Sequence, residues 1–458
     1  MIKLNPQIFR EYDIRGTVDK DLSDEFAFLL GRAYATLAKD HGKNKIAIGY
    51  DCRHSSEGYA RALADGMSSE GIDSVLTGMG PTPQLYYSIF KRNYGGGIQI
   101  TGSHNPPDMN GFKLCLGTDT LASSDIQDLK DRCEVCLTKQ PGPKLGKIGE
   151  DNIRAEYIED LANNCKAFMG KRKIKVVVDA GNGVGGLVGP EVLRRLGCEV
   201  IELYCDPDGD FPNHHPDPTV LDYIQDLIKS VKENKADLGI GWDGDADRIG
   251  VVDQKGQVIF GDMLLLIYAR QILKDLPGAT IIGDVKCSSR LFDDIKKRGG
   301  NAIMWKTGHS LIKQKLKETG GALGGEMSGH IAFKHRFFGF DDAIYSTARL
   351  MEVVSQTDLP VSDFLKDLPA MVSTPEIRSD CPEEIKFKIA ELAKEAFKEY
   401  QVSTIDGVRI QFDKGWALVR ASNTQPILVM RFEAESADDL DRYQKLVLDR
   451  IEAIKRSL

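Results

Sequence analysis

The sequence predicts an α/β protein of three tandem α/β domains with parallel-rich sheets and a C-terminal α+β domain, arranged around a central cleft. Two observations give this fold class. Short apolar, β-rich runs alternate with helix-length segments in three successive copies, and this pattern changes after about residue 366. A chain of 458 residues is also longer than a single hydrophobic core supports. We therefore expect four domains.

Each of the first three domains contributes three predicted strands that end in polar or glycine-containing loops. In the first domain, 1–150, these are KIAIGYDCR, SVLTGMGPTP and GGGIQITGSHNP. In the second, 151–255, they are KIKVVVDAGNG, EVIELYCDPDGDFP and ADLGIGWDGDADR. In the third, 256–366, they are TIIGDVKCS, NAIMWKTGHS and GALGGEMSGH. Such strands, separated by helices, are typical of parallel sheets covered on both faces.

The fourth domain, 367–458, has a different order of elements. PEEIKFKIAELAKEAFKEY begins with Pro382 and acidic residues, as a helix start should. Strands are expected at GVRIQF, WALVRAS and ILVMRFEA, and a final helix from Ser436 carries apolar residues on one face. This order indicates an α+β unit with an antiparallel hairpin.

Composition restricts the class of partner and the compartment. The net charge is −8 and no basic tract is present, so nucleic acid is not an expected partner. The first residues lack the apolar core of a secretion signal, and no apolar run approaches the roughly 20 residues that cross a bilayer. We expect a cytoplasmic protein without a membrane partner. Cys133 and Cys136 have no second pair to complete a zinc site and are expected to be reduced cysteines on a helix.

The polar loops fall at the carboxyl ends of strands, where ligands collect in parallel sheets. In TGSHNPP, Ser103 lies between a glycine that permits a tight turn and a His-Asn-Pro-Pro run that interrupts regular structure. We expect its hydroxyl to be exposed. His104 is adjacent, but neighbouring side chains on an extended chain point apart, so a Ser-His hydrolase is not favoured. A simple polar turn is the alternative.

DGDADR places Asp243, Asp245 and Asp247 directly after a strand. Three carboxylates this close repel one another unless a cation holds them, and oxygen ligands suit Mg²⁺. The alternative is a solvated acidic turn.

Two further loops carry groups that bind sugars or phosphates. GEMSGH supplies Glu326, Ser328 and His330, which suit sugar hydroxyls. RASNTQP supplies donors that suit a phosphate, and the alternative is a hairpin turn. The donors are Arg420, Ser422, Asn423 and Thr424, with Arg431 on the next strand. Cationic groups also gather near the strand ends, at Arg15, Arg53, Lys113, Arg248, Lys286 and His309.

In order along the chain, TGSHNPPDMNGFK, DGDADR, GEMSGH and RASNTQP resemble the four active-site loops of the α-D-phosphohexomutases, and most closely those of the bacterial phosphomannomutase/phosphoglucomutase type. The resemblance covers essentially the whole chain, including FREYDIRG near the start. It implies reversible interconversion of hexose 1-phosphate and hexose 6-phosphate, with a bisphosphorylated hexose, such as glucose 1,6-bisphosphate, as intermediate and activator. The partners it implies are small hexose phosphates, and we expect a monomer or weak homodimer.

The resemblance also implies a role for each loop. Ser103 would carry the phosphoryl group, and Mg²⁺ would be held by the three aspartates and an oxygen of that phosphoserine. Glu326 and Ser328 would bind sugar hydroxyls, and the RASNTQP loop would bind the substrate's phosphate. The positions that line the cleft in the family correspond to Tyr12, Arg15, Lys113, Arg248, Lys286 and His309. Lys113 and His309 are the candidates for general acid and base, whereas Arg15 and Arg248 would stabilise charge.

Three alternatives stay open. A phosphoglucosamine mutase shares the fold and mechanism, but such members typically have Gln where this chain has Met327. A catalytically silent sugar-phosphate-binding protein would keep the cleft, yet Ser103 and the aspartates are all present here. A phosphatase would have no need of a phosphate-binding loop in a fourth domain.

Overall fold

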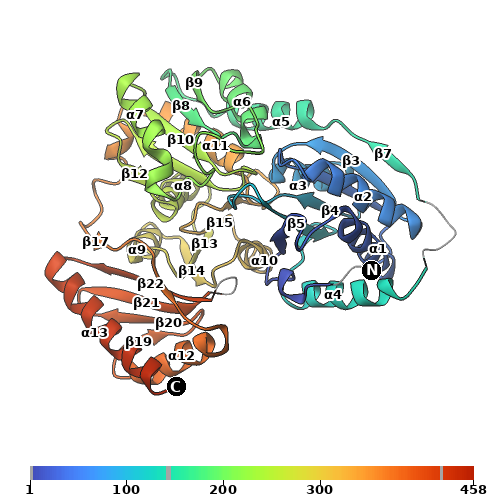
Figure 1. Ribbon diagram of the computed structural model, residues 1–458. Coiled ribbons are helices and arrows are strands. Elements are labelled where there is room, and N and C mark those ends of the chain that lie inside the picture. The colour runs from blue at the N-terminus through green and yellow to red at the C-terminus, as the bar shows by residue number, and fades with distance from the viewer. Residues whose placement is uncertain (1–3, 141–145, 423–425) are drawn as a thin grey trace.

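The computed structural model describes residues 4–140, 146–422 and 426–458. Four sheets follow one another along the chain, each with its own helices (Figure 1). The predicted fold class is confirmed: mixed α/β sheets form the first three units, and an antiparallel sheet forms the fourth. Asn423 and Thr424 of the predicted phosphate loop lie outside the described residues.

The first unit has a seven-stranded sheet in the order β1-β5-β4-β2-β3-β7, with β6 beside β5. Its strands are β1 (Ile14–Thr17), β2 (Lys45–Tyr50), β3 (Asp73–Met79), β4 (Gly96–Ile100), β5 (Met109–Leu116), β6 (Asp119–Thr120) and β7 (Ile148–Glu150). Its helices are α1 (Asp24–Asp40), α2 (Ser56–Ser69), α3 (Thr82–Arg92) and α4 (Ser124–Leu137). The three parallel strands at the centre, β2, β3 and β4, were predicted, whereas the antiparallel β5 and β1 were not.

Alternation along β2 explains why both faces of this sheet are covered. Ile46 and Ile48 face the core under α1, α2 and α4, and Ala47 between them faces the core that contains α3. Cys133 and Cys136 are buried on α4 in the same core as Ile46, as two reduced cysteines would be.

The second unit has a five-stranded sheet in the order β12-β11-β10-β8-β9. Its strands are β8 (Lys175–Asp179), β9 (Glu199–Leu203), β10 (Leu238–Trp242), β11 (Ile249–Asp253) and β12 (Val258–Ile259). Its helices are α5 (Arg154–Lys166), α6 (Gly189–Arg195) and α7 (Gln225–Glu233). β10 runs parallel to β8 and antiparallel to β11, so the chain reverses in the loop between β10 and β11, where DGDADR lies.

The third unit has a four-stranded sheet in the order β14-β13-β15-β16. Its strands are β13 (Thr280–Asp284), β14 (Asn301–Trp305), β15 (Leu323–Gly325) and β16 (Ile331–Phe333). Its helices are α8 (Gly261–Asp275), α9 (Ser289–Lys297), α10 (His309–Thr319) and α11 (Ala343–Ser355). α11 also packs against the second unit, where Thr347 accepts a hydrogen bond from the Trp242 indole at 3.0 Å. The second and third units therefore share one continuous core.

The fourth unit has its own core beneath a six-stranded sheet and lies beyond β14 and α9 in Figure 1. Its strands are β17 (Val372–Ser373), β18 (Ile377–Asp380), β19 (Gln401–Ser403), β20 (Val408–Phe412), β21 (Gly415–Ala421) and β22 (Ile427–Ala434). Its helices are α12 (Glu383–Ala396) and α13 (Ala437–Arg456). α13 begins directly after Ser436, in agreement with the predicted helix start, and Ser436 caps it by accepting a hydrogen bond from the Asp439 amide.

Candidate active site

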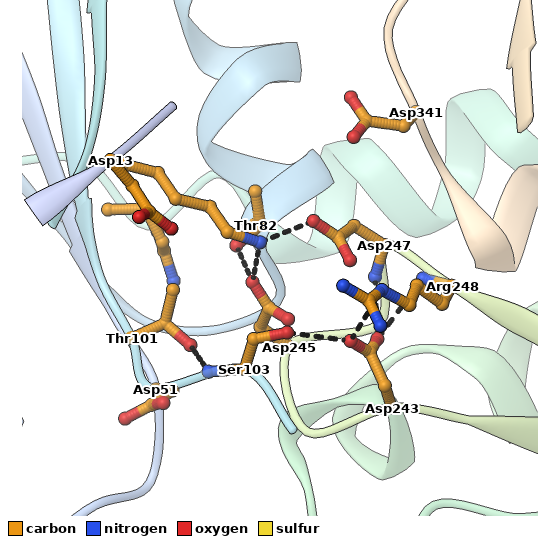
Figure 2. Close-up of polar contacts among 12 residues, drawn as sticks. Asp13, Asp51, Thr82, Thr101, Ser103, Asp243, Asp245, Asp247, Arg248 and Asp341 are labelled. Carbon is orange, nitrogen blue, oxygen red and sulfur yellow. Dashed lines mark hydrogen bonds and ion pairs between the residues drawn. The ribbon is translucent and has the colours of Figure 1, made fainter. Parts of the chain in front are cut away.

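Ser103 is buried beside the aspartate loop instead of being exposed. Ser103 follows β4, and its backbone is left-handed, with φ of 50°. Its amide donates a hydrogen bond to Thr101 Oγ1 at 2.8 Å, which stabilises this turn. The residue is 1% exposed, and its hydroxyl donates to Asp243 Oδ2 at 2.8 Å (Figure 2). The expectation of an exposed hydroxyl is thus wrong, because the second unit covers the loop.

The same left-handed turn corrects the expectation for His104. The backbone is not extended here, and His104 Nδ1 lies 3.1 Å from Ser103 Oγ. Burial, together with the nearby Arg248 and Arg15, lowers the pKa of His104 well below its ordinary value. His104 is therefore a neutral neighbour of the hydroxyl, in addition to lining the cleft described below.

Asp243, Asp245 and Asp247 are fully buried, so the alternative of a solvated turn is excluded. Each offers one oxygen within 4.8 Å of the others. Burial and the neighbouring Asp247 and Asp245 raise the pKa of Asp243 well above its ordinary value. Within the described part of the chain, the buried Asp245 Oδ1 has no hydrogen-bond partner, and the buried Asp247 Oδ1 has only the His330 ring nearby, at 3.3 Å. Repelling carboxylates with unsatisfied oxygens fit a hard divalent cation such as Mg²⁺.

Lys113 supplies a positive charge to this cluster from β5. Its ammonium lies 2.6 Å from Asp245 Oδ2 and also contacts Asp247 Oδ2. Burial alone would lower the pKa of Lys113, but Asp245 and Asp247 raise it well above the ordinary value. A lysine held in the charged form can offset negative charge or donate a proton, and it is poorly suited to accept one.

Two arginines flank the serine and aspartate loops. Arg15 on β1 pairs with Asp13 at 2.7 Å and donates to the Gly102 carbonyl at 2.5 Å, next to Ser103. Arg248 follows the aspartates, and its Nε lies 4.0 Å from Asp243 Oδ2. Both lie where they can stabilise charge at the serine hydroxyl.

The serine and aspartate loops are in direct backbone contact. A Cβ atom placed on Gly244 would lie 2.4 Å from the Ser103 carbonyl oxygen, so only glycine fits at that position. Arg53, which the sequence grouped with the site cations, supports the same loop from behind. Its guanidinium donates to the Ser103 carbonyl at 2.9 Å and to other carbonyls of the loop.

A cleft of about 670 Å³ runs from this loop to the fourth unit and is lined by all four units. The predicted site residues that line it are Tyr12, His104, Arg248, Lys286, His309, Glu326, Ser328, His330, Arg420 and Ser422. Ser103, Lys113, Arg15 and the three aspartates lie behind its wall, with His104 as the lining neighbour of Ser103. The structure thus brings the four motifs around one space.

The GEMSGH loop forms a buried ionic chain that leads from the lining of the cleft to Asp247. His330 Nδ1 lies 2.9 Å from Glu326 Oε2, and its Nε2 lies 3.3 Å from Asp247 Oδ1. Burial opposes the charge, yet Asp247 and Glu326 raise the pKa of His330 to about 9, and His330 lowers the pKa of Glu326 to about 2. Glu326 Oε1 also accepts a hydrogen bond from the Gly308 amide at 2.7 Å.

At the far end of the cleft, two cations pair with carboxylates of the fourth unit. Lys286 Nζ lies 3.2 Å from Glu376 Oε2, and Arg420 Nε lies 2.9 Å from Asp406 Oδ2. Arg431 does not line the cleft. It lies buried between the third and fourth units, 3.2 Å from Asp262 and in contact with the Lys286 carbonyl.

Sequence reasoning missed several residues that organise the site. Thr82 donates its hydroxyl to Asp245, and its place after the β3 strand was a usable signal. Glu376, Asp406 and Asp341 gave no signal, because each is an acidic residue in a polar or mixed stretch far from the quoted motifs.

Among the described residues, no helix is long and apolar enough to cross a membrane.

Comparison with known proteins places this geometry in a family. Family models for phosphoglucomutase/phosphomannomutase match as alpha/beta/alpha domains I, II and III over residues 6–134, 155–256 and 260–372, and as the C-terminal domain over 376–450. A phosphomannomutase/phosphoglucomutase of Pseudomonas aeruginosa is 44% identical over 99% of this chain and 97% of its own. A phosphoglucomutase of Neisseria meningitidis serogroup A is 45% identical over 97% and 96%.

Among solved structures, a phosphoglucomutase/phosphomannomutase family protein from Burkholderia thailandensis is 40% identical and superposes with a TM-score of 0.92. The match covers 99% of this chain and 98% of the other. The likeness therefore extends over all four units and their arrangement.

Proposed function

The chain belongs to the phosphoglucomutase/phosphomannomutase family, and we propose that its Ser103 is the phosphoryl carrier in the reversible interconversion of hexose 1-phosphate and hexose 6-phosphate. The enzyme is an isomerase that moves a phosphate between two positions of one sugar. The observation that carries the assignment of Ser103 is its hydroxyl, buried 2.8 Å from Asp243 in a cluster of three aspartates and a lysine.

The reaction consists of two phosphoryl transfers at Ser103. In the first, the bond from phosphorus to Ser103 Oγ breaks and a bond to the free sugar oxygen forms, while the sugar hydroxyl gives up its proton and the released Ser103 Oγ takes one up. The product is a bisphosphorylated hexose, such as glucose 1,6-bisphosphate, which also serves as activator of unphosphorylated enzyme. It turns over in the cleft, and its other phosphate moves to Ser103 Oγ. The serine hydroxyl gives up its proton in this step, and the sugar oxygen that is released takes one up.

The charges around Ser103 suit these transfers. Asp243, Asp245, Asp247 and a phosphoserine oxygen would hold Mg²⁺, which when bound neutralises charge that develops on the phosphoryl group. Lys113 and Arg248 add positive charge from two sides, and Arg15 fixes the carbonyl next to the serine. Electrostatic stabilisation of this kind is the main contribution that a protein makes to phosphoryl transfer.

Substrate recognition must serve both orientations of the sugar. We assign the hydroxyls between the two ends to Glu326 and Ser328, with Tyr12, His104, His309 and His330 lining the same cleft. Lys286, Arg420 and Ser422, together with Asn423 and Thr424, would bind the phosphate that is not being transferred. Arg431 would act on this phosphate only through the Lys286 loop that it contacts. Because none of these contacts requires one configuration at C2, glucose and mannose phosphates are both expected substrates.

A coupled assay tests this function. Wild type and Ser103→Ala are compared on glucose 1-phosphate and mannose 1-phosphate, with and without magnesium, and we expect activity on both sugars that needs the serine and the metal. Glucosamine 6-phosphate is run in parallel, and a higher rate on it would indicate a phosphoglucosamine mutase. Intact-mass measurement of protein purified from cells should show one phosphate that Ser103→Ala lacks, whereas a silent binding protein would show none.

A further inference from the structure

A second cavity, which we call the interunit cavity, lies between the first and third units beside α10. Its volume is about 790 Å³, compared with about 670 Å³ for the cleft, and small-molecule sites typically measure roughly 300 to 1,000 Å³. Its lining comes from residues 86–125 of the first unit and 310–340 of the third, and none of these lining residues also lines the cleft. The proposed function gives this cavity no role.

One wall of the interunit cavity is aromatic, and both units contribute to it. Phe90 on α3 packs against Phe338 at a centroid distance of 5.1 Å, and Tyr86 packs against Phe340 at 5.6 Å. Tyr86 and Phe340 are buried, whereas Phe90 and Phe338 are half-buried at the edge of the core that contains α3. A core that ends in partly exposed rings offers a planar ligand a surface on which to stack.

Two lysines bring positive charge to this wall. Lys334 Nζ donates to the Phe338 carbonyl at 3.4 Å and forms no ion pair within the described residues. Lys313 Nζ lies 4.5 Å from the centroid of the Tyr86 ring, and it donates to Asp341 Oδ1 at 2.7 Å. Lys334 is therefore the cation that an anionic group beside the rings would meet without displacing a carboxylate.

The carboxylates of the lining do not cancel this charge. Asp119 of the first unit pairs with Lys317 of the third at 2.7 Å, and Glu318 pairs with Lys315, which lies outside the lining. Asp125 lies in the first turn of α4, where the backbone amides of the helix offset its charge. The interunit cavity is thus suited to a ligand that is both aromatic and anionic.

The cavity and the cleft share a thin wall. His309, the first residue of α10, lines the cleft, and Lys313, one turn later, lines the cavity. Asp341 lies between them, 2.7 Å from Lys313 Nζ and 3.2 Å from His309 Nδ1. An anion bound in the cavity would compete with Asp341 for the charge of Lys313, so its effect would reach the cleft through a single carboxylate.

We propose that the interunit cavity is a second ligand site, which binds a small aromatic anion and transmits its occupancy to the cleft through Lys313 and Asp341. The planar body of the ligand stacks on Phe90 and Phe338, and its carboxylate, sulfonate or phosphate pairs with Lys334. This ligand belongs to a different chemical class from the hexose phosphates of the cleft.

Fluorescence titration with two probes tests the site. 1-Anilinonaphthalene-8-sulfonate is an aromatic anion, and N-phenyl-1-naphthylamine has the same rings without the charge. We expect one anionic probe per chain. Gln314 also lines the cavity, and Gln314→Glu adds a negative charge at nearly constant size. Gln314→Glu and Lys334→Met should each raise the Kd of the anionic probe by about 3- to 10-fold and change that of the neutral probe by less than about twofold.

Controls place the probe. Lys366→Met removes an exposed lysine of the third unit that pairs with Asp363, outside the cavity, and should change neither Kd. Phe387→Ser removes an exposed ring of α12 and should also have no effect, whereas Phe338→Leu should weaken both probes by about 3- to 10-fold. The proposal is overturned if Gln314→Glu and Lys334→Met leave the anionic Kd unchanged, or if Phe387→Ser abolishes binding.

Calorimetry tests the link to the cleft, and this step rests on the proposed function for its sugar. Saturating anionic probe should weaken binding of glucose 1-phosphate by about 3- to 10-fold and then reach a plateau, and glucose 1-phosphate should weaken probe binding by the same factor. Lys313→Met should remove this coupling. An effect without a plateau would mean that probe and sugar compete for one site, and no effect would mean that the sites are uncoupled. Either result contradicts the proposal, whereas a wild type without mutase activity would remove the proposed function and leave the probe titrations valid.

Discussion

The two ends of the cleft pair their charges in different ways. At the serine end, the aspartates are fully buried and Lys113 is 3% exposed, and the partners come from two units locked together by backbone contact. At the far end, Lys286 and Arg420 line the cleft and pair with carboxylates whose side chains are 22% and 15% exposed. Fixed charges suit a reacting centre. Carboxylates that a phosphate can replace as partners of Lys286 and Arg420 suit a place where phosphates enter and leave.

The strongest test of this difference is Ser103→Ala. Removing the only group that we assign as phosphoryl carrier should lower kcat by about 10⁴-fold or more, because no other group replaces it. The affinity for glucose 1-phosphate, measured by calorimetry, should change by less than about threefold, since the far end is intact. If Ser103→Ala instead lost its affinity for glucose 1-phosphate, the serine end would be shown to contribute to substrate binding as well as to the reaction.

The next test removes a charge from the metal cluster. Asp245→Asn should lower kcat by about 10²- to 10³-fold, because a cation that neutralises phosphoryl charge contributes several kcal/mol. A chelator should abolish the wild-type activity and added magnesium should restore it. Asp210→Asn, in the exposed group of His54, Asp208 and Asp210, is the control and should keep full activity.

Arg420→Met tests the far end. Loss of a charge-assisted contact to phosphate should raise KM by about 10- to 100-fold and leave kcat within a few-fold, as measured by steady-state kinetics. Arg442→Met removes an equally charged but exposed group of the same unit and should change neither constant. A fall in kcat with unchanged KM would place Arg420 in the chemical step.

Glu376→Gln should produce the smallest effect, and it should lower KM where Arg420→Met raises it. Glu376 holds Lys286 in an ion pair that an incoming phosphate must replace, and Lys286 and Arg378 lower the pKa of Glu376 to about 2 although burial opposes this. Neutralising it should lower KM by about 3- to 10-fold, because the competitor is removed. Glu391→Gln on the exposed face of α12 is the control. A raised KM would mean that Glu376 positions Lys286.

The sequence allowed the fold class and most of the site to be predicted because strand-end loops of successive units face the same space. Ser103, the aspartates, Glu326 and His330 were found in this way. Burial was misjudged for Ser103, since spacing along the chain gives no sign that a second unit will cover a loop.

Other features escaped prediction for related reasons. The carboxylates Glu376 and Asp406 become partners of site cations only through the docking of the fourth unit. The antiparallel β5, which carries Lys113 into the aspartate cluster, follows an irregular loop and was not recognised as a strand. Arg431 and Arg53 have the charge expected of phosphate ligands, but each is committed to backbone carbonyls.

The absence of a side chain at Gly244 restricts which parts of the molecule can move during turnover. Because a Cβ atom at position 244 would lie 2.4 Å from the Ser103 carbonyl oxygen, the serine and aspartate loops pack backbone against backbone. We expect this packing to keep Ser103 Oγ in one place through both half-reactions. The half-turn that presents first one carbon and then the other must therefore be made by the sugar itself. The phosphoryl-carrying serine thus stays fixed while the bisphosphorylated sugar reorients.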